Sequence, residues 1–161
     1  MNIIMTGSTS FVGAATVREL LRRGHTVTAI VRPKSSKLDT ILEGNEEALL
    51  SGRLLVTEND LSEPEKLLEK VTKPQEVFCH FGWGGSGSVS RTDKALQEKN
   101  MEISLETIRT AKALGCKKFL FSGSQAEYGM HQDLITENTV CEPKSLYGEA
   151  KLAMREKGEK L

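Results

Sequence analysis

Near the N-terminus the sequence reads Asn2-Ile3-Ile4-Met5-Thr6-Gly7-Ser8-Thr9-Ser10-Phe11-Val12-Gly13, which we interpret as a buried strand, a tight turn and the start of a helix. Residues 3–5 are apolar without alternation, as in a parallel strand that is covered on both faces. Gly7 ends the strand, and a helical pattern of apolar residues then runs from Gly13 to a stop at Gly24. The backbone N–H groups at such a helix start converge on one spot, which favours a phosphate.

The glycine spacing of this turn is close to a dinucleotide-binding fingerprint, with one departure. Gly7 permits the sharp turn and Gly13 lets the helix approach the sheet, but the middle position holds Ser10 instead of glycine. Ser10 or Thr9 is also a candidate for an ordinary N-cap. The glycines alone therefore favour a cofactor site and plain strand-to-helix packing about equally, and the missing Gly-Lys-Ser/Thr argues against a P-loop.

The composition is that of one balanced domain. The 161 residues include 22 Lys+Arg and 22 Asp+Glu, so the formal charge gives no indication of a nucleic-acid-binding or polybasic membrane surface. No signal-peptide pattern is present, and no apolar run reaches the roughly 18 residues of a membrane-spanning helix. The three cysteines and three histidines are scattered, which fits neither a metal site nor a disulfide framework. We expect a cytoplasmic protein without nucleic-acid or membrane partners.

Strand and helix patterns alternate along the rest of the chain. After the first strand, further strands are predicted at 26–31, 53–57, 76–81 and 118–121. Helical segments are predicted at 38–50, after a capping box at 62–65, at 92–114 and around 147–151. This alternation predicts right-handed crossovers and a doubly wound parallel sheet of Rossmann type, with five or more strands, in one domain of residues 1–161. Ligands of such sheets bind beyond the carboxyl ends of the strands.

The loop after the second strand is basic. In a dinucleotide fold an Asp or Glu at this point accepts from the 2′-hydroxyl of the adenosine ribose, whereas here Arg32 follows Val31. A guanidinium with Ser35 and Lys37 nearby suits a 2′-phosphate, because a dianion needs charge-assisted donors. We therefore predict NADP in preference to NAD; the alternative is a solvated basic loop.

The fourth strand leads from Phe81 into a glycine-rich loop, residues 82–88, that contains Trp83. Few side chains in it obstruct a ligand, so we predict that it lies beside the cofactor, the alternative being a merely mobile loop. His80 is interpreted as a packed strand residue. Asn100 lies on the inner face of the long helix, where a polar amide needs partners, so it either bonds the ends of neighbouring strands or reaches the cofactor region.

A tyrosine and a lysine stand four residues apart in the last predicted helix. Tyr147 and Lys151 therefore share one helical face. An ammonium favours the phenolate form of a nearby tyrosine, which can take a proton from an alcohol while hydride leaves the same carbon, or return one to a carbonyl. Ser124, just after the fifth strand, is placed to hold the substrate oxygen. Tyr-x-x-x-Lys occurs often by chance, but its place behind a dinucleotide-type turn favours catalysis.

Together these motifs resemble the extended short-chain dehydrogenase/reductases, the nucleotide-sugar epimerase and dehydratase group. The similarity covers nearly the whole chain and is carried by Thr6-Gly7, Ser10 to Gly13, Asp60-Leu61, Asn100, residues 121–129, Glu137, Pro143, Tyr147-Gly148 and Lys151. The resemblance implies that Tyr147 transfers the proton, that Lys151 also binds the nicotinamide ribose, and that Ser124 positions the substrate. It also implies an adenine contact from Asp60 and a nicotinamide contact from the stretch that begins at Gly82.

The sequence thus predicts catalytic and cofactor-binding sets. The catalytic residues are Tyr147, Lys151 and Ser124. The cofactor-binding residues are Gly7, Ser10, Phe11, Val12, Gly13, Arg32, Ser35, Lys37, Asp60, Leu61, Phe81, Gly82, Trp83, Asn100, Tyr147 and Lys151.

The resemblance implies an NAD(P)-dependent epimerase, dehydratase or reductase that acts on a nucleotide sugar. Family members continue with a C-terminal substrate-binding region, which we expect to be missing from a chain that ends at Leu161. The alternatives are a non-catalytic dinucleotide-binding module and a structural dimerisation domain. Family members commonly pair through the two helices equivalent to 92–114 and 145–161, so the resemblance also implies a homodimer.

Overall fold

The computed structural model describes residues 1–85 and 87–161, which form two compact units. The first unit contains residues 1–82 and 106–121, and the second contains residues 83–105 and 122–161. Ser86, part of the predicted glycine-rich loop, lies outside the described residues.

The first unit is built on a five-stranded parallel sheet in the order β3-β2-β1-β4-β5. Because β1 is central, the chain first winds outward on one side and then on the other, which makes the sheet doubly wound. The strands are β1 (Asn2–Thr6), β2 (Thr26–Val31), β3 (Leu54–Glu58), β4 (Val77–His80) and β5 (Lys118–Phe121). The predicted Rossmann-type sheet is confirmed, with the bounds of some strands shifted by one residue.

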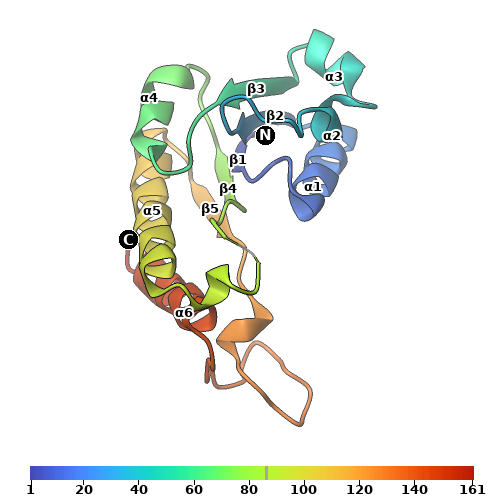
Figure 1. Ribbon diagram of the computed structural model, residues 1–161. Helices are drawn as coiled ribbons and strands as arrows, with labels where there is room; N and C mark the ends of the chain where they lie inside the picture. The colour runs from blue at the N-terminus through green and yellow to red at the C-terminus, as the bar shows by residue number, and fades with distance from the viewer. Residues whose placement is uncertain (86) are drawn as a thin grey trace. The chain divides into compact units, whose positions relative to one another are not determined.

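Helices of the first unit cover both faces of this sheet (Figure 1). One face carries α1 (Phe11–Arg22), α2 (Asp39–Leu42) and α3 (Glu46–Leu50), and the other carries α4 (Leu67–Lys70) and the C-terminal part of α5 (Lys94–Ala113). Within β1, Ile3 and Met5 belong to the first core and Ile4 to the second, since successive strand residues point to opposite faces. Burial on both faces explains the unbroken apolar run.

Two glycines allow the close backbone approaches around the first turn. Gly7 has a φ of +69°, and a Cβ placed on it would lie 2.6 Å from the carbonyl carbon of Phe81. A Cβ on Gly13 would overlap the carbonyl oxygen of Gly7. Both positions therefore require glycine, as the sequence predicts.

The second unit contains η2 (Ser90–Thr92), the N-terminal part of α5, η3 (Gln125–Glu127) and α6 (Leu146–Gly158). Ser145 caps α6, because its hydroxyl accepts from the N–H of Gly148 at 3.1 Å. A Cβ on Gly148 would overlap the carbonyl oxygen of Ala126, so α6 packs directly on η3.

The capping box predicted at residues 62–65 is wrong. The hydroxyl of Ser62 donates to Asp60 Oδ1 at 2.6 Å instead of capping a helix, and a short η1 (Pro64–Lys66) precedes α4. The Asp60 carboxylate is charged and therefore a strong acceptor, so the Ser62 hydroxyl is directed toward it and away from the helix start. A complete capping box occurs at η3, between Ser124 and Glu127.

Among the described residues, none of the helices combines the length and the apolar character that a membrane crossing requires.

Candidate functional site

The first turn presents a helix start in the form that anions favour. Ser10 is the N-cap of α1, since its hydroxyl accepts from the N–H of Gly13 at 3.0 Å. Its own N–H donates to the carbonyl of Gly7 at 3.0 Å, which closes the turn. Phe11 and Val12 follow with 94% and 60% of their surfaces exposed. The structure thus favours the N-cap interpretation of Ser10 and leaves the first turn of α1 accessible to a phosphate.

A groove of about 580 Å³ adjoins this helix start. It is lined by Ser10, Phe11 and Lys37, together with Arg18 and residues of the α2 region. Lys37 is therefore brought to the turn, as predicted. In the described part of the chain Arg32 and Ser35 are not among the lining residues, although both lie in the same loop after β2.

An acid that the sequence interpretation missed also lies at this loop. Glu58, the last residue of β3, pairs in register with Val31, the last residue of β2. Its carboxylate accepts from the backbone N–H of Lys34 at 3.3 Å. An acid at the loop after β2 thus comes from the neighbouring strand, which only the sheet register reveals.

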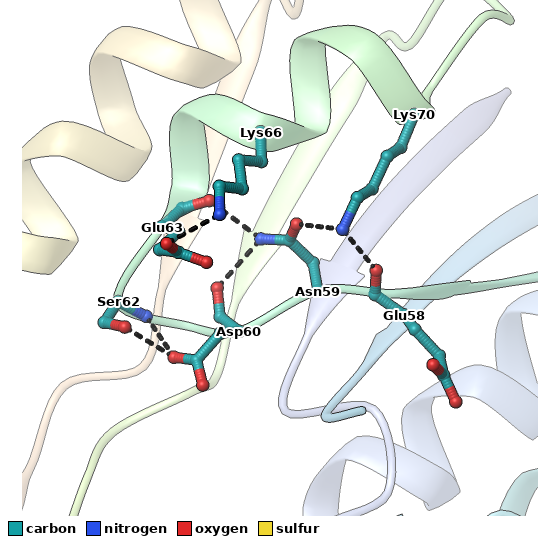
Figure 2. Close-up of polar contacts among 7 residues, drawn as sticks. All are labelled: Glu58, Asn59, Asp60, Ser62, Glu63, Lys66 and Lys70. Atoms are coloured by element: carbon teal, nitrogen blue, oxygen red, sulfur yellow. Dashed lines mark hydrogen bonds and ion pairs between the residues drawn. The ribbon is translucent and has the colours of Figure 1, made fainter. Parts of the chain in front are cut away.

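A polar network fixes the turn after β3 (Figure 2). The buried amide of Asn59 donates to the carbonyl oxygens of Asp60 at 2.8 Å and Glu63 at 2.9 Å. Its oxygen accepts from Lys70 Nζ at 2.9 Å, and Lys70 also donates to the carbonyl of Glu58 at 2.8 Å. Asn59 therefore holds the Asp60-Leu61 turn from inside. No sequence pattern indicates this role of Asn59, apart from its position next to Asp60.

Asp60 and Leu61 themselves shape the end of the strand. Asp60 Oδ1 accepts from the backbone N–H of Ser62 at 2.9 Å as well as from its hydroxyl (Figure 2). A methyl group of Leu61 lies 2.8 Å from the position that a Cβ would take on Gly82. Leu61 is thus packed at the start of the glycine-rich loop, and a side chain at position 82 would have to displace its methyl groups. The adenine contact of Asp60 stays a prediction.

The fourth strand ends in a fixed backbone. Thr6 Oγ1 accepts from the N–H of Gly82 at 3.3 Å and lies 2.9 Å from His80 Nδ1. His80 is fully buried and its ring stacks on Phe121. The interpretation of His80 as a packed strand residue is confirmed, and Phe81 and Gly82 are held beside the first turn.

In the second unit, α6 brings Tyr147 and Lys151 together as predicted. Lys151 is only 2% exposed, and its Nζ donates to the carbonyl of Ser122 at 2.9 Å. The same Nζ lies 4.0 Å from the centroid of the Trp83 ring and 5.9 Å from that of Tyr147. Burial lowers the pKa of Lys151 to about 8, and the carboxylate of Glu127 opposes this shift. The ammonium is therefore charged at neutral pH but close to its titration.

Ser124 is held by a buried acid. Its backbone N–H donates to Glu127 Oε1 at 2.6 Å, and its hydroxyl accepts from the N–H of Ala126 at 3.2 Å. Glu127 is 2% exposed and forms an ion pair with Arg155 of α6 at 3.5 Å. The sequence identified Ser124 but gave Glu127 and Arg155 no role. Their pairing could not be seen there, because the two residues are 28 positions apart.

Asn100 fixes the loop that follows β4. Its oxygen accepts from the N–H of Gly84 at 3.0 Å and its amide donates to the carbonyl of Gly84 at 2.8 Å. This two-way bond satisfies the buried amide through backbone, and it fixes the residue next to Trp83. Of the two alternatives, the structure shows structural satisfaction; a cofactor contact of Asn100 stays a prediction.

The comparison with known families agrees with this arrangement. A sequence model described as the NAD dependent epimerase/dehydratase family matches residues 3–159. The chain belongs to this family. The resemblance inferred from the motifs is thereby confirmed.

The family's members include relatives with named activities. The dTDP-6-deoxy-L-talose 4-dehydrogenase (NAD(+)) of Aggregatibacter actinomycetemcomitans is 31% identical over 156 residues, 97% of this chain and 53% of that protein. A UDP-glucose 4-epimerase of Pisum sativum is 26% identical, over 96% of this chain and 45% of its own length. The crystal structure of the UDP-glucose 4-epimerase of Thermotoga maritima with UDP-glucose superposes with a TM-score of 0.80 at 25% identity, over 99% of this chain and 50% of that one. The chain spans about half the length of these relatives.

The buried ammonium makes the stability depend on pH. The pKa of Lys151 in the folded protein, about 8, lies below its ordinary value of 10.5, so between these pH values the unfolded chain binds more protons and the wild-type stability rises with pH. Lys151→Met should therefore increase the free energy of unfolding at pH 7, by about 1–3 kcal/mol, and this gain should vanish as the pH approaches 10.5. Urea denaturation at a series of pH values measures both.

The matched control is Lys160→Met, which removes an exposed lysine just after the same helix. It should change the unfolding free energy little at any pH. A Lys151→Met variant whose unfolding free energy is lower than that of the wild type by the same amount at every pH would contradict the interpretation.

Proposed function

We propose that residues 1–161 form the dinucleotide-binding domain, with the proton-transfer residues, of an NAD(P)-dependent epimerase, dehydratase or reductase that acts on a nucleotide sugar. The observation that carries this proposal is the buried ammonium of Lys151 on the same face of α6 as Tyr147. The turn at Gly7 and Gly13 supports a dinucleotide. A side chain at either position would collide with neighbouring backbone, so the turn needs both glycines, as dinucleotide-binding turns do. The names of the relatives refer to UDP-glucose and to a dTDP-sugar, which supports a nucleotide sugar as substrate.

The chemistry follows from the residues of the second unit. When bound, the dinucleotide supplies the hydride acceptor for the carbon that is oxidised. Tyr147, as phenolate, takes the proton from the hydroxyl on that carbon, and the Lys151 ammonium stabilises the phenolate before the transfer. The Ser124 hydroxyl binds the same substrate oxygen. In the reverse direction Tyr147 returns the proton to the carbonyl oxygen as hydride adds to the carbon.

Tyr147→Phe tests the proton transfer, because phenylalanine keeps the ring and removes the acid–base group. We expect the rate of hydride transfer from UDP-glucose or a dTDP-hexose to NADP⁺ or NAD⁺ to fall by about 10²-fold or more. Absorbance of the reduced cofactor measures the rate. An equal rate in the variant would remove Tyr147 from the mechanism.

The choice of dinucleotide is a second part of the proposal. Arg32, Ser35 and Lys37 support NADP, since a guanidinium, an ammonium and a hydroxyl are donors for a 2′-phosphate. Glu58 favours NAD instead, because an acid at the end of the adjoining strand can accept from a 2′-hydroxyl and repels a phosphate. We propose that the cations dominate and that NADP is preferred.

A titration of the chain with NADPH and NADH, followed by cofactor fluorescence, decides between the two dinucleotides. We expect tighter binding of NADPH, a loss of about tenfold or more in NADPH affinity for Arg32→Glu, and little change for NADH. Glu58→Gln is the matched control and should leave the preference for NADPH intact. Tighter NADH binding that weakens in Glu58→Gln would show that Glu58 sets the choice.

We also propose a homodimer formed through α5 and α6. In the second unit a groove of about 180 Å³ is lined by residues of both helices, among them Met101, Leu146, Ala150 and Ala153 together with Lys, Glu and Gln side chains. Apolar side chains beside polar ones are typical of an interface between copies.

Light scattering tests this pairing. The chain should have twice its monomer mass, and Ala153→Arg, which places a long charged side chain in the groove, should halve it without unfolding the protein. Ala113→Arg, at the other end of α5, serves as the comparison and should keep the double mass. A monomeric wild-type chain would refute the proposed dimer.

A further inference from the structure

The single tryptophan of the chain lies against the buried lysine. Trp83 follows β4, and the centroid of its ring is 4.0 Å from Lys151 Nζ. We propose that Trp83 is a positioning residue for Lys151, in that the face of the indole holds the ammonium in place beside Tyr147 and favours its charged form. This inference rests on the proposed function of Lys151 in proton transfer.

The contact has the geometry of a cation–π interaction. A cation within about 6 Å of an aromatic centroid is attracted by the negative face of the ring, and tryptophan gives the strongest effect. One N–H of Lys151 already donates to the carbonyl of Ser122 at 2.9 Å. Because the ammonium is almost completely buried, water cannot supply the rest of its stabilisation, and the indole face replaces part of it.

The indole is itself held in place by Gln97 of α5. Trp83 Nε1 donates to Gln97 Oε1 at 3.0 Å, and Gln97 Nε2 donates to the carbonyl of Ser90 at 2.7 Å. Gln97 is 2% exposed, so both ends of its amide are fixed inside the unit. A chain of contacts therefore runs from Ser90 through Gln97 and Trp83 to Lys151.

The same indole also touches the tyrosine. The rings of Trp83 and Tyr147 meet edge to face, with centroids 6.1 Å apart and planes at 87°. The guanidinium of Arg91 lies 4.9 Å from the Tyr147 centroid. Trp83 thus contacts both members of the Tyr-x-x-x-Lys pair, which a side chain with a purely local structural role would not need to do.

The groups around the ammonium determine the direction in which the pKa of Lys151 shifts. Burial disfavours the charged form, while the carboxylate of Glu127, the carbonyl of Ser122 and the Trp83 face favour it. Cations on the neighbouring elements include Arg91 of η2, over the Tyr147 ring, and Arg155 of α6, which pairs with Glu127. Removal of the indole should therefore lower the pKa of Lys151.

The first test uses Trp83 as its own reporter. With one tryptophan in the chain, emission excited where tyrosine does not absorb comes from Trp83 alone. Indole emission responds to a charge against the ring, so we expect a pH transition with its midpoint near 8. The transition should be lost in Lys151→Met and kept in the matched control Lys160→Met. A flat profile, or a transition that persists in Lys151→Met, would overturn the proposal.

The second test follows Lys151 directly. Competitive acylation of the amine at a series of pH values, read by mass spectrometry, gives its titration midpoint. Trp83→Leu should lower this midpoint by about half a pH unit or more, and Trp83→Phe, which keeps a π face, should lower it less. An unchanged midpoint in both variants would overturn the proposal.

Neither test uses cofactor or substrate. The shift with Trp83→Leu can therefore be observed even if hydride transfer fails, in which case Lys151 is held as proposed but the enzymatic function is wrong. Conversely, an active chain whose emission and acylation profiles do not depend on Trp83 and Lys151 retains the function and loses this inference.

Discussion

The buried ammonium of Lys151 is the constraint on which the arrangement of the second unit depends. A charge removed from water is unfavourable unless polar groups and opposite charges surround it. The Ser122 carbonyl, the Trp83 ring and the nearby Glu127 carboxylate supply these, and they come from two stretches of the chain, residue 83 and residues 122–127. Those segments must therefore be ordered together for the lysine to stay charged.

The same acid connects the lysine to the serine. Glu127 influences the charge of Lys151, accepts from the backbone of Ser124 and pairs with Arg155. A side chain that makes all three interactions couples the position of Ser124 to that of the ammonium. The capping box at η3 is thus more than a helix start, since Glu127 at its third position also acts on Lys151.

The sheet, the first turn and the Tyr147–Lys151 pair could be predicted because their signals are local. Apolar runs mark strands, the glycines at 7 and 13 mark a turn whose backbone has no room for a Cβ, and an i,i+4 spacing places two side chains on one face. Glu58 could not be predicted, because its place beside the loop after β2 depends on strand register. Asn59 with Lys70, and Trp83 with Lys151, depend on packing between segments 11 and 68 positions apart. The false capping box at residues 62–65 shows the converse, since a local pattern failed when Asp60 took the serine hydroxyl.

The two units use their cations in different ways, and the difference follows from solvent. Arg32 and Lys37 are exposed, so their attraction for an anion is screened over about 8–10 Å at physiological ionic strength. Such charges attract and select a ligand, and salt weakens their effect. Lys151 is screened from salt by burial, so its charge responds to pH and to the groups that touch it. The first unit is therefore suited to dinucleotide recognition through exposed cations and backbone donors. We propose that the second serves proton transfer, because a buried and tightly surrounded charge acts strongly on a neighbouring phenol.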